Sequence, residues 1–597
     1  MIGRVVQSWP RAALILAVVA LIATASAPVR AGHVAPTRLK MRAVKAKTPV
    51  VPTRATGGGR GAAPRPWEAR ISIRGTARAP TEVRGRRDVP LTLEERTAQR
   101  IEDVLRGPLR SGTTALYVVD ASSGNELFSV HPDDPLNPAS NVKLVATAAA
   151  LDILGTDYRY LTRLFGPTPT ADGAVRGDVY LLGSYDPTLA RTDLDDMARL
   201  LVASGVRRVD GDVVVGSTPT RDGIYRARAF LQITAGLPGL PPKVEVQPAY
   251  DFVTVEVKAT TSKHRRGKLT FTEEPIVDPA GHVRVKVTIE GTIGRGRVAQ
   301  RWVWPRERAL HTAHLLRAAL VRAGIELHGD AHIAEFPDYV GAGTGHGWLP
   351  VELVAHRSAP LATIVAQVNK RSINWLADRV IMTAAAVKYA EIPSMERAVD
   401  AMYAWLAANT GLGRSDLVID TGSGLSYRTE LSARQIVKIL RTAAGLGASA
   451  TDPGLRERQA SYLASLSIGG IDGTLRSRFR LPTLAGKVRA KTGTLRHAIA
   501  LSGLLEAVPG RPLAFALVSN GHPASHKLRV RAAHEKVVAI LADYAAQVAA
   551  QSPAPVAAPV AAPVAAPVLP TNPDDPGPTE GEDAEDGADP TADRPTR

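Results

Sequence analysis

The chain of 597 residues contains no cysteine and few aromatic residues, which make up only 5% of it. Without cysteine it has no disulfide framework, no thiolate nucleophile, no Cys-ligated zinc or iron–sulfur site and no lipidated N-terminal cysteine. It also lacks an apolar run of the roughly 20 residues that span a bilayer. Hydrophobic residues nevertheless make up 45% of the sequence, so a wholly disordered chain is excluded.

The first 31 residues have the pattern of a secretory signal peptide. Arg4 and Arg11 form a positively charged start, an unbroken apolar run follows from Ala12 to Ala23, and small residues come next. We expect residues 1–31 to be cleaved and the mature protein to be exported to the periplasm or cell envelope. The alternative is that this segment is not cleaved and anchors the protein in the membrane, with flanking residues completing the span.

Two further segments have the composition of disordered tails. Residues 32–90 are rich in Arg, Ala, Pro and Gly, and 15 Lys or Arg face three acids between Pro28 and Pro90. Residues 549–597 combine a Pro/Ala spacer with an acidic end, where nine acids face two basic residues from Asp574 onward. Because neither segment can bury enough apolar surface to fold, we expect a basic linker and an acidic tail.

The formal net charge of +17 suggests nucleic acid or an anionic surface as a partner. Much of this charge lies in the basic segment 32–90, and export argues against nucleic acid. We therefore expect contact with an anionic cell envelope through the basic segment, or no partner at all if the segment is a solvated tether.

Between these tails, residues 91–548 alternate strand-like and helix-like patterns, which predicts a mixed α/β globular region. The predicted strands are 115–120, 126–130, 178–182, 212–215, 252–257, 283–289, 487–495, 498–507 and 513–519, and the predicted helices are 139–154, 194–203, 309–323, 361–389 and 527–546.

Serine is the natural candidate for a covalent nucleophile in a chain without thiols. Ser140 and Lys143 stand three residues apart near the start of a predicted helix, so the amine can reach the hydroxyl. Pro138 suits a first turn, and the helix N-terminus favours negative charge near the serine. A desolvated lysine can serve as general base. Alone the pair is a weak signal, since roughly one Ser-x-x-Lys is expected by chance.

Two more elements strengthen this signal. Ser372-Ile373-Asn374 lies within the helical region 361–389, and Lys491-Thr492-Gly493-Thr494 lies on a predicted strand. Each alone is compatible with an ordinary structural role. The chain contains a single Ser-x-x-Lys and a single Lys-Thr-Gly, and the three elements occur in the order typical of penicillin-recognising serine acyltransferases.

From about residue 91 to 548 the chain resembles the low-molecular-mass class C penicillin-binding proteins, the D-alanyl-D-alanine carboxypeptidase/endopeptidases. The resemblance implies a penicillin-binding/β-lactamase-like α+β catalytic domain, in which an antiparallel sheet is flanked by helices. The segments that carry it are 138–144 with 148–151, 183–189, 369–374, 422–426 and 470–475.

The spacing of the elements predicts how this catalytic domain is divided. Between Lys143 and Ser372 lie 228 residues, more than a compact penicillin-recognising domain needs. The resemblance implies one or two inserted domains here, which we place at 166–350 as a mixed α/β region. The catalytic domain is then discontinuous, with one part at 91–165 and the other at 351–548.

The resemblance also implies the role of each site residue. Ser140 attacks the substrate carbonyl while Lys143 accepts its proton. Ser372 relays a proton to the leaving amine, and Asn374 contacts both the substrate amide and the lysine.

The third element binds the substrate in this scheme. Lys491 and Thr492 hold its terminal carboxylate, backbone N–H groups of Ser140 and Thr494 form the oxyanion hole, and Gly493 keeps the strand clear. No cofactor is implied, and no metal, since the 14 histidines show no ligand spacing.

The function implied is a serine DD-peptidase that cleaves the D-Ala-D-Ala bond or D-Ala cross-links of peptidoglycan stem peptides, with β-lactams as covalent inhibitors. A serine β-lactamase or esterase of the same fold and a non-catalytic cell-wall-binding protein are the alternatives, although compact β-lactamases lack so long an insertion. Relatives often grip the stem peptide with Trp, Asp and Tyr in the inserted region. The comparable stretch here, Asp222–Tyr250, has no Trp, and Asp378 stands where relatives often have Glu.

Overall fold

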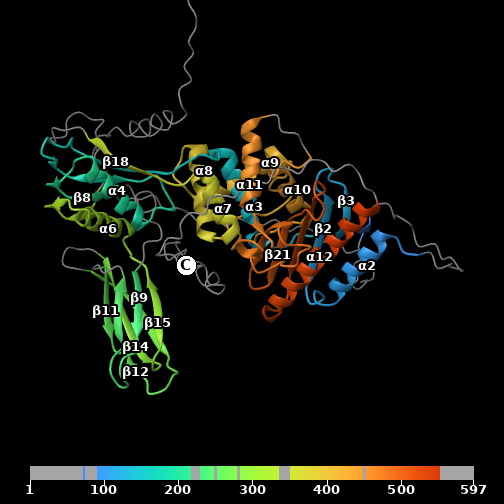
Figure 1. Cartoon of the computed structure of the whole chain (residues 1–597), viewed down its shortest axis with the longest axis horizontal. Helices are drawn as coiled ribbons and strands as arrows, with labels where there is room; N and C mark the ends of the chain where they lie inside the picture. Colours follow the sequence, from blue (N-terminus) through green and yellow to red (C-terminus); the bar gives the residue numbers. More distant parts are fainter. Residues whose placement is uncertain are drawn as a thin grey trace, which may run out of the picture.

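The computed structural model describes three bodies, which we call the core (72–73, 90–160 and 358–551), the α/β lobe (161–216 and 304–357) and the β lobe (229–303) (Figure 1). The expected signal peptide, nearly all of the expected basic linker and the chain beyond residue 551 lie outside the described residues. The residues described are 72–73, 90–216, 229–247, 252–277, 283–334, 350–447 and 452–551.

The core is built on a seven-stranded sheet in the order β1–β3–β2–β22–β21–β20–β19. Every neighbouring pair in it is antiparallel, so the expected antiparallel catalytic sheet is confirmed. Strands near the two ends of the core sequence meet at its centre, where β2 pairs with β22. The strands are β1 (Ser72–Ile73), β2 (Thr113–Asp120), β3 (Glu126–Val130), β19 (Ser467–Ile468), β20 (Val488–Thr494), β21 (Ala498–Leu505) and β22 (Leu513–Asn520).

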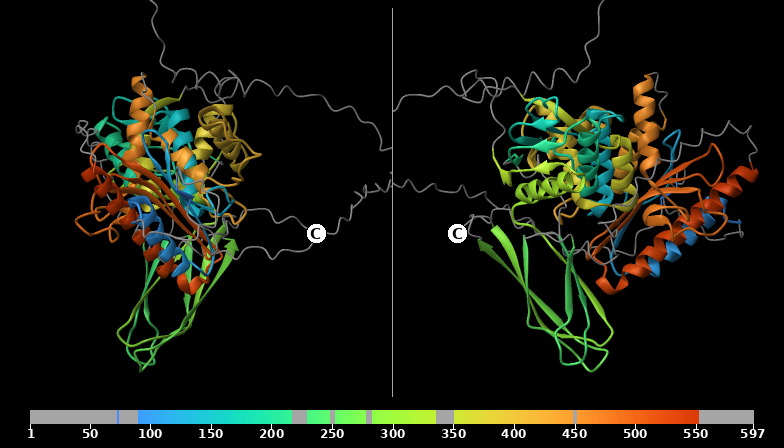
Figure 2. Two further views of the ribbon diagram at one scale, coloured as in Figure 1. Left: turned by 90° about the vertical axis from the view of Figure 1, so that its right-hand side faces the viewer. Right: turned by 60° about the vertical axis from the view of Figure 1, so that its left-hand side comes forward.

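Both faces of this sheet are covered by helices. Side chains alternate across a strand, so Tyr117 and Val119 of β2 pack on one face while Leu116 and Val118 pack on the other. Helices α2 (Leu93–Arg106) and α12 (Lys527–Gln551) cover the second face (Figure 2). The first face carries α3 (Lys143–Leu154), α7 (Leu361–Arg371), α8 (Asn374–Tyr389), α9 (Met395–Thr410), α10 (Ala433–Ala443) and α11 (Pro453–Ser465).

The α/β lobe contains a five-stranded mixed sheet in the order β17–β8–β6–β4–β18 and a small parallel sheet, β16–β7–β5. Strands β17, β8 and β6 run parallel, whereas β4 and β18 pair antiparallel with their neighbours. Helices α4 (Arg191–Ala203) and α6 (Arg308–Arg322) bury their apolar faces against these strands. The strands are β4 (Leu161–Gly166), β5 (Ala174–Val175), β6 (Val179–Leu182), β7 (Arg208–Val209), β8 (Val213–Val215), β16 (Glu326–Leu327), β17 (Ala331–Ile333) and β18 (Val351–Arg357).

The β lobe is formed by two small sheets that enclose their own apolar cluster. One has the order β10–β9–β15, and in the other β14 pairs with β11, β12 and β13. Figures 1 and 2 show the β12 end pointing away from the rest of the molecule. The strands are β9 (Ala229–Thr234), β10 (Lys243–Gln247), β11 (Val253–Val257), β12 (Thr260–Thr261), β13 (Leu269–Val277), β14 (Val283–Ile293) and β15 (Val298–Val303).

The α/β lobe joins the core through two adjacent chain segments. The backbone N–H of Ser358 donates to the carbonyl of Tyr160, and the Tyr160 N–H donates to Ser358 Oγ at 2.9 Å. The expected boundary at 165/166 falls inside β4, and the one at 350/351 directly precedes β18. Because β4 and β18 pair within the lobe, we propose boundaries at 160/161 and 357/358 instead. Within the described ranges, no helix has the length and apolar character needed to cross a membrane.

Candidate active site

Ser140 and Lys143 lie at the start of α3, where the apolar helix enters the core. Lys143 is fully buried, and its Nζ donates to Ser140 Oγ at 3.0 Å. It also donates to Asn374 Oδ1 and to the carbonyl of Ser423, both at 2.6 Å. The amine is thus held against the hydroxyl by two fixed acceptors, a geometry suited to proton transfer.

The turn that carries Ser140 differs from the regular helix expected over 139–154. Residues 139–142 form a 3-10 turn, α3 begins only at Lys143, and Ala139 has a φ of 48°. This left-handed conformation costs energy for a residue with a side chain. It is fixed by close packing, because a Cβ on Gly424 would lie 2.2 Å from the Ala139 carbonyl oxygen.

The Ser-x-Asn element lies at a break in the helical region 361–389. Ser372 ends α7 with a φ of 56°, and Asn374 begins α8. In a continuous helix, the side chains of Ser372 and Asn374 would point in different directions from one straight axis. The break instead turns the Asn374 side chain toward Lys143 and brings the Ser372 hydroxyl to Lys491.

The Lys-Thr-Gly element lies on β20, next to the nucleophile turn. Lys491 is fully buried, and its Nζ donates to Ser372 Oγ at 2.7 Å and to the Thr492 carbonyl at 2.8 Å. A Cβ on Gly493 would lie 2.5 Å from the Pro138 carbonyl oxygen, so only glycine allows this approach. The Thr494 hydroxyl accepts a hydrogen bond from Arg531. The structure therefore brings all three predicted elements together.

Sequence reasoning missed the residues that support this arrangement, and it left Lys370 without a role. Lys370 Nζ lies 2.6 Å from Asp472 Oδ2 and donates to the Leu466 carbonyl, so it ties the end of α7 to the loop between β19 and β20. Thr474, on the same loop, shares a 3.0 Å hydrogen bond with the Thr492 hydroxyl. The segment 470–475 was noticed only as part of a family resemblance, and this network gives it a structural reason.

Asp378 and Ser423 are further residues that only the structure assigns. Asp378 follows Asn374 by one turn of α8 and lies behind the Ser423 segment. Burial raises the pKa of the Asp378 carboxyl, while the Lys143 charge and the polar groups of Gly422 and Ser423 oppose that rise. A carboxyl group therefore lies close to the buried amine of Lys143.

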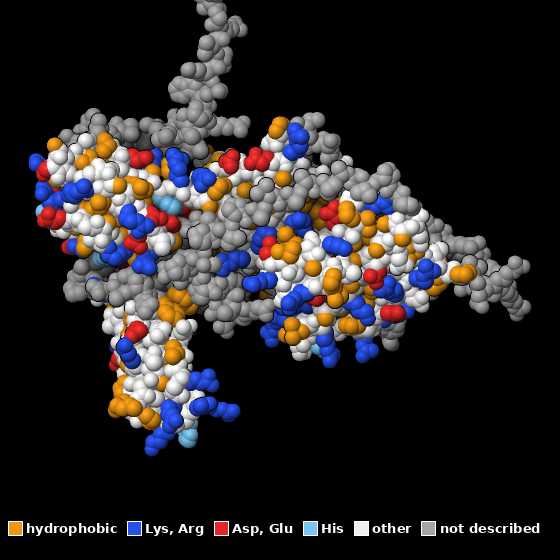
Figure 3. Space-filling model, in the orientation of Figure 1, with side chains coloured by type: hydrophobic (Ala, Val, Ile, Leu, Met, Phe, Trp, Pro, Cys, Tyr) orange, Lys and Arg blue, Asp and Glu red, His pale blue; other side chains and the backbone are white. Residues whose placement is uncertain are grey.

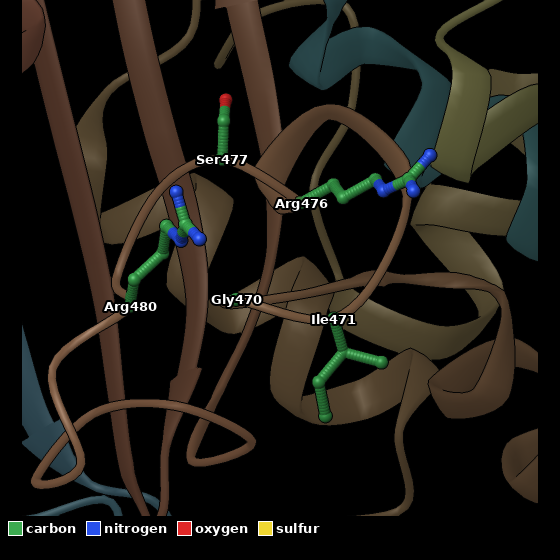
Figure 4. A pocket seen from close by; sticks show the side chains of 5 residues that line it. All are labelled: Gly470, Ile471, Arg476, Ser477 and Arg480. Atoms are coloured by element: carbon green, nitrogen blue, oxygen red, sulfur yellow. The ribbon is translucent and has the colours of Figure 1, made fainter.

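A cavity of about 390 Å³ is lined by Gly470, Ile471, Arg476, Ser477 and Arg480 of the β19–β20 loop (Figure 4). The side chains of Arg476 and Arg480 point in different directions there, so they do not converge on one ligand. Both ends of the stretch 222–250, which differs from the relatives' substrate-gripping pattern, lie outside the described residues.

The fold and these groups together define the class: a penicillin-recognising serine hydrolase, with a lysine beside the serine hydroxyl and a second lysine on the neighbouring strand. Comparisons with known proteins specify it further. The model of the D-Ala-D-Ala carboxypeptidase 3 (S13) family matches residues 97–228 and 217–543. The chain belongs to this family, and the expected resemblance is confirmed.

Individual relatives agree with the family. The D-alanyl-D-alanine carboxypeptidase of Actinomadura sp. is 30% identical over 487 residues, which cover 74% of this chain and 84% of that protein. Carboxypeptidase DacB of Mycolicibacterium smegmatis is 28% identical over 422 residues, covering 68% and 75%. Penicillin binding protein 4 of Haemophilus influenzae, solved with a β-lactam, has a TM-score of 0.59 at 20% identity and covers 74% of this chain and 99% of its own. Its likeness confirms the expected fold class.

Proposed function

We propose that the chain hydrolyses the bond that follows the penultimate D-Ala of peptidoglycan stem peptides through an acyl-enzyme on Ser140. The observation that carries this is the 3.0 Å contact between Lys143 Nζ and Ser140 Oγ, inside a family of D-Ala-D-Ala carboxypeptidases. Cleavage of D-Ala cross-links is the same reaction with a longer leaving group. β-Lactams acylate the same serine.

In the first step, Ser140 Oγ attacks the carbonyl carbon and its proton passes to Lys143. Asn374 and the Ser423 carbonyl hold the amine in line for this transfer, so little reorganisation is needed. Backbone N–H groups of Ser140 and Thr494 stabilise the oxyanion that forms. The close packing of Gly493 on the Pro138 carbonyl sets the distance between these two donors.

In the second step, the C–N bond breaks and the leaving amine takes a proton through Ser372. Lys491, which donates to Ser372 Oγ, orients this hydroxyl and supplies positive charge for the terminal carboxylate of the substrate. Thr492 adds a hydroxyl donor to the same carboxylate. Water then attacks the ester, its proton passes to Lys143, and Ser140 is regenerated.

We also propose that the protein is exported and acts in the periplasm or cell envelope, with residues 1–31 as the signal peptide. The support is the charged start and short apolar run of this segment, together with a substrate class that lies outside the cytoplasm. The basic linker 32–90 then contacts anionic components of the envelope, and nucleic acid is not a partner.

Incubation of the purified full chain with a fluorescent penicillin tests the proposed nucleophile. We expect a stable covalent band that Ser140→Ala abolishes and that Ser525→Ala, a change at an exposed serine of the core, leaves intact. Rapid turnover of the drug would identify a β-lactamase instead. Labelling that persists in folded Ser140→Ala protein would overturn the assignment of the nucleophile.

A further inference from the structure

Three loops meet at the far end of the β lobe, and we call them the tip: residues 235–242, 262–268 and 294–297. They are held together by backbone hydrogen bonds, with Arg295 N–H donating to the His264 carbonyl and Ala235 N–H donating to the Arg297 carbonyl. A Cβ on Gly294 would lie 2.3 Å from the Arg265 carbonyl oxygen. The loops are therefore closely packed, and their side chains keep a fixed relative position.

The tip is strongly basic and carries no acid. Its six cations are exposed, and within the described residues none of them forms an ion pair. The carboxylate of Glu256, on a strand leading to the tip, already faces Lys286 and Lys258, and Glu290 also faces Lys258. In Figure 3 this end of the lobe appears as blue side chains around one pale-blue histidine. The cations are Lys263, Arg265, Arg266, Lys268, Arg295 and Arg297.

Exposed leucines lie in the same tip. Residues 237–240 form a tight turn with Pro238 and Gly239 at its centre; Leu240 N–H donates to the Leu237 carbonyl, and Gly239 has a φ of 84°. The turn is attached to Thr261 by two backbone hydrogen bonds. The side chains of Leu237 and Leu240 are 71% and 55% exposed. A rigid turn thus presents two large apolar groups to solvent beside the cations.

A rigid end that gathers exposed like charges beside exposed apolar side chains has the composition of an interaction surface. A polymer of phosphates would neutralise the cations but leave the leucines in water. The surface of a bilayer matches both features, because anionic headgroups attract Lys and Arg while the acyl boundary accepts leucine. We propose that the tip docks on a bilayer that contains anionic phospholipid.

The position of the tip fits this role. It lies at the end of the β lobe that points away from the core in all three views of the chain. Docking there leaves the site around Ser140 uncovered and holds the core at a distance from the bilayer. The contact is additional to the basic linker and does not depend on the proposed reaction.

Co-sedimentation of the full chain with phosphatidylcholine vesicles, with and without phosphatidylglycerol, tests the proposal. A variant in which Lys263, Arg265, Arg266 and Lys268 are changed to Gln is compared with a control of equal net charge. Each cation near an anionic surface contributes about fivefold to partitioning, so loss of four cations should make the tip variant bind about 600-fold more weakly than the control. The control changes four exposed core cations, Arg110, Lys438, Arg529 and Lys536, to Gln.

A leucine variant separates a bilayer from a soluble polyanion. Leu237→Ser with Leu240→Ser should weaken binding to phosphatidylglycerol vesicles by roughly tenfold and leave retention on immobilised polyphosphate unchanged. Undiminished vesicle binding by this variant, or equal losses in the tip variant and the charge control, would overturn the proposal. Penicillin labelling and the unfolding midpoint of each variant verify that the protein is folded, so that lost binding reports on the tip.

Discussion

The core and the β lobe differ in where their cations lie, because the core buries two lysines and the β lobe exposes a group of cations. In the core, Lys143 and Lys491 have no exposed surface, and each amine donates to fixed acceptors around the serine hydroxyls. At the tip of the β lobe, six cations are exposed and have no ion-pair partner among the described residues. A buried cation is held in one geometry at a high desolvation cost, whereas an exposed cation is cheap, solvated and free to meet a partner.

This contrast separates two uses of positive charge. Proton transfer and carboxylate recognition need a fixed distance between the amine and its partner. Burial of the two amines in the core provides this distance, although their desolvation lowers the stability of the fold. Attraction to a surface needs only the sum of many charges within about 10 Å of the partner. Removal of a lysine charge should therefore abolish activity in the core and leave activity unchanged at the tip.

The largest effect is expected for Lys143→Met. Loss of the proton acceptor should lower the rate of penicillin acylation by about 10³-fold or more, because general base catalysis contributes on that scale. The variant should stay folded, since loss of a buried charge offsets the two acceptors left unpaired. Lys263→Met at the tip should acylate at the original rate. Stopped-flow labelling measures both, and normal labelling by Lys143→Met would remove this lysine from the base role.

A smaller loss of activity is expected where a cation acts only by positioning. Lys370→Met or Asp472→Asn should slow acylation by roughly 10- to 100-fold, because both loosen the loop that supports Thr492. The double variant should lose no more than either single one, since both changes break one interaction. Additive losses would show that the two residues act separately. Lys370→Arg, which keeps the ion pair, should restore part of the rate.

Acid stability offers a third test, because burial lowers the pKa of His534 in the core to about 3. The folded state keeps this histidine neutral, whereas the unfolded state takes up a proton below its ordinary pKa of 6.5. Its contribution to stability is thus fully present above pH 6.5 and is lost as the pH falls toward 3, by about 1.4 kcal/mol per unit.

Urea unfolding of His534→Gln from pH 7 to pH 5 measures this contribution. The variant should lose about 2 kcal/mol less over that range than the unchanged protein. His264→Gln, at the exposed tip, should follow the unchanged protein. Parallel pH profiles for His534→Gln and the unchanged protein would contradict the assignment.

The smallest effect is expected for stability at the tip. Changing Lys263, Arg265, Arg266 and Lys268 to Gln should alter the free energy of unfolding by no more than about 0.5 kcal/mol, because these side chains make no ion pairs in the described structure. Urea unfolding at low salt is the measurement. A marked stabilisation would mean that repulsion within the tip is larger than solvent screening allows, which would sharpen the case for an external partner.

Much of the core could be predicted from local pattern. Short, nearly continuous apolar runs bounded by turn residues marked β2, β21 and β22, and this is the pattern of strands that are buried on both faces. The boundaries of the inserted region could not be placed as well. Neither β4 nor β18 is among the predicted strands, and nothing in the local sequence indicates that these two segments pair across nearly two hundred residues.

Within the site, the motif residues could be found from order and spacing, but their supports could not. Asp472 is distant in sequence from Lys370, and the ion pair forms only after α7 packs beside β19. The Ser423 carbonyl is a backbone group, so the residue type at this position does not indicate its role. The left-handed turn at Ser372 was not predicted because the helical patterns on its two sides merge into one region when they are read from the sequence.

The sequence by itself determined which residues carry the chemistry: a chain without thiols, with Ser140 three residues from Lys143 and two further elements in a fixed order. Its motifs also predicted the fold of the core through the family that they resemble, whereas the local patterns alone indicated only a mixed α/β region. Only the tertiary structure decided the distances that make these residues a site and the meeting of separate loops at the basic tip. Such distances depend on contacts between residues far apart in the chain, where packing rather than local preference sets the geometry.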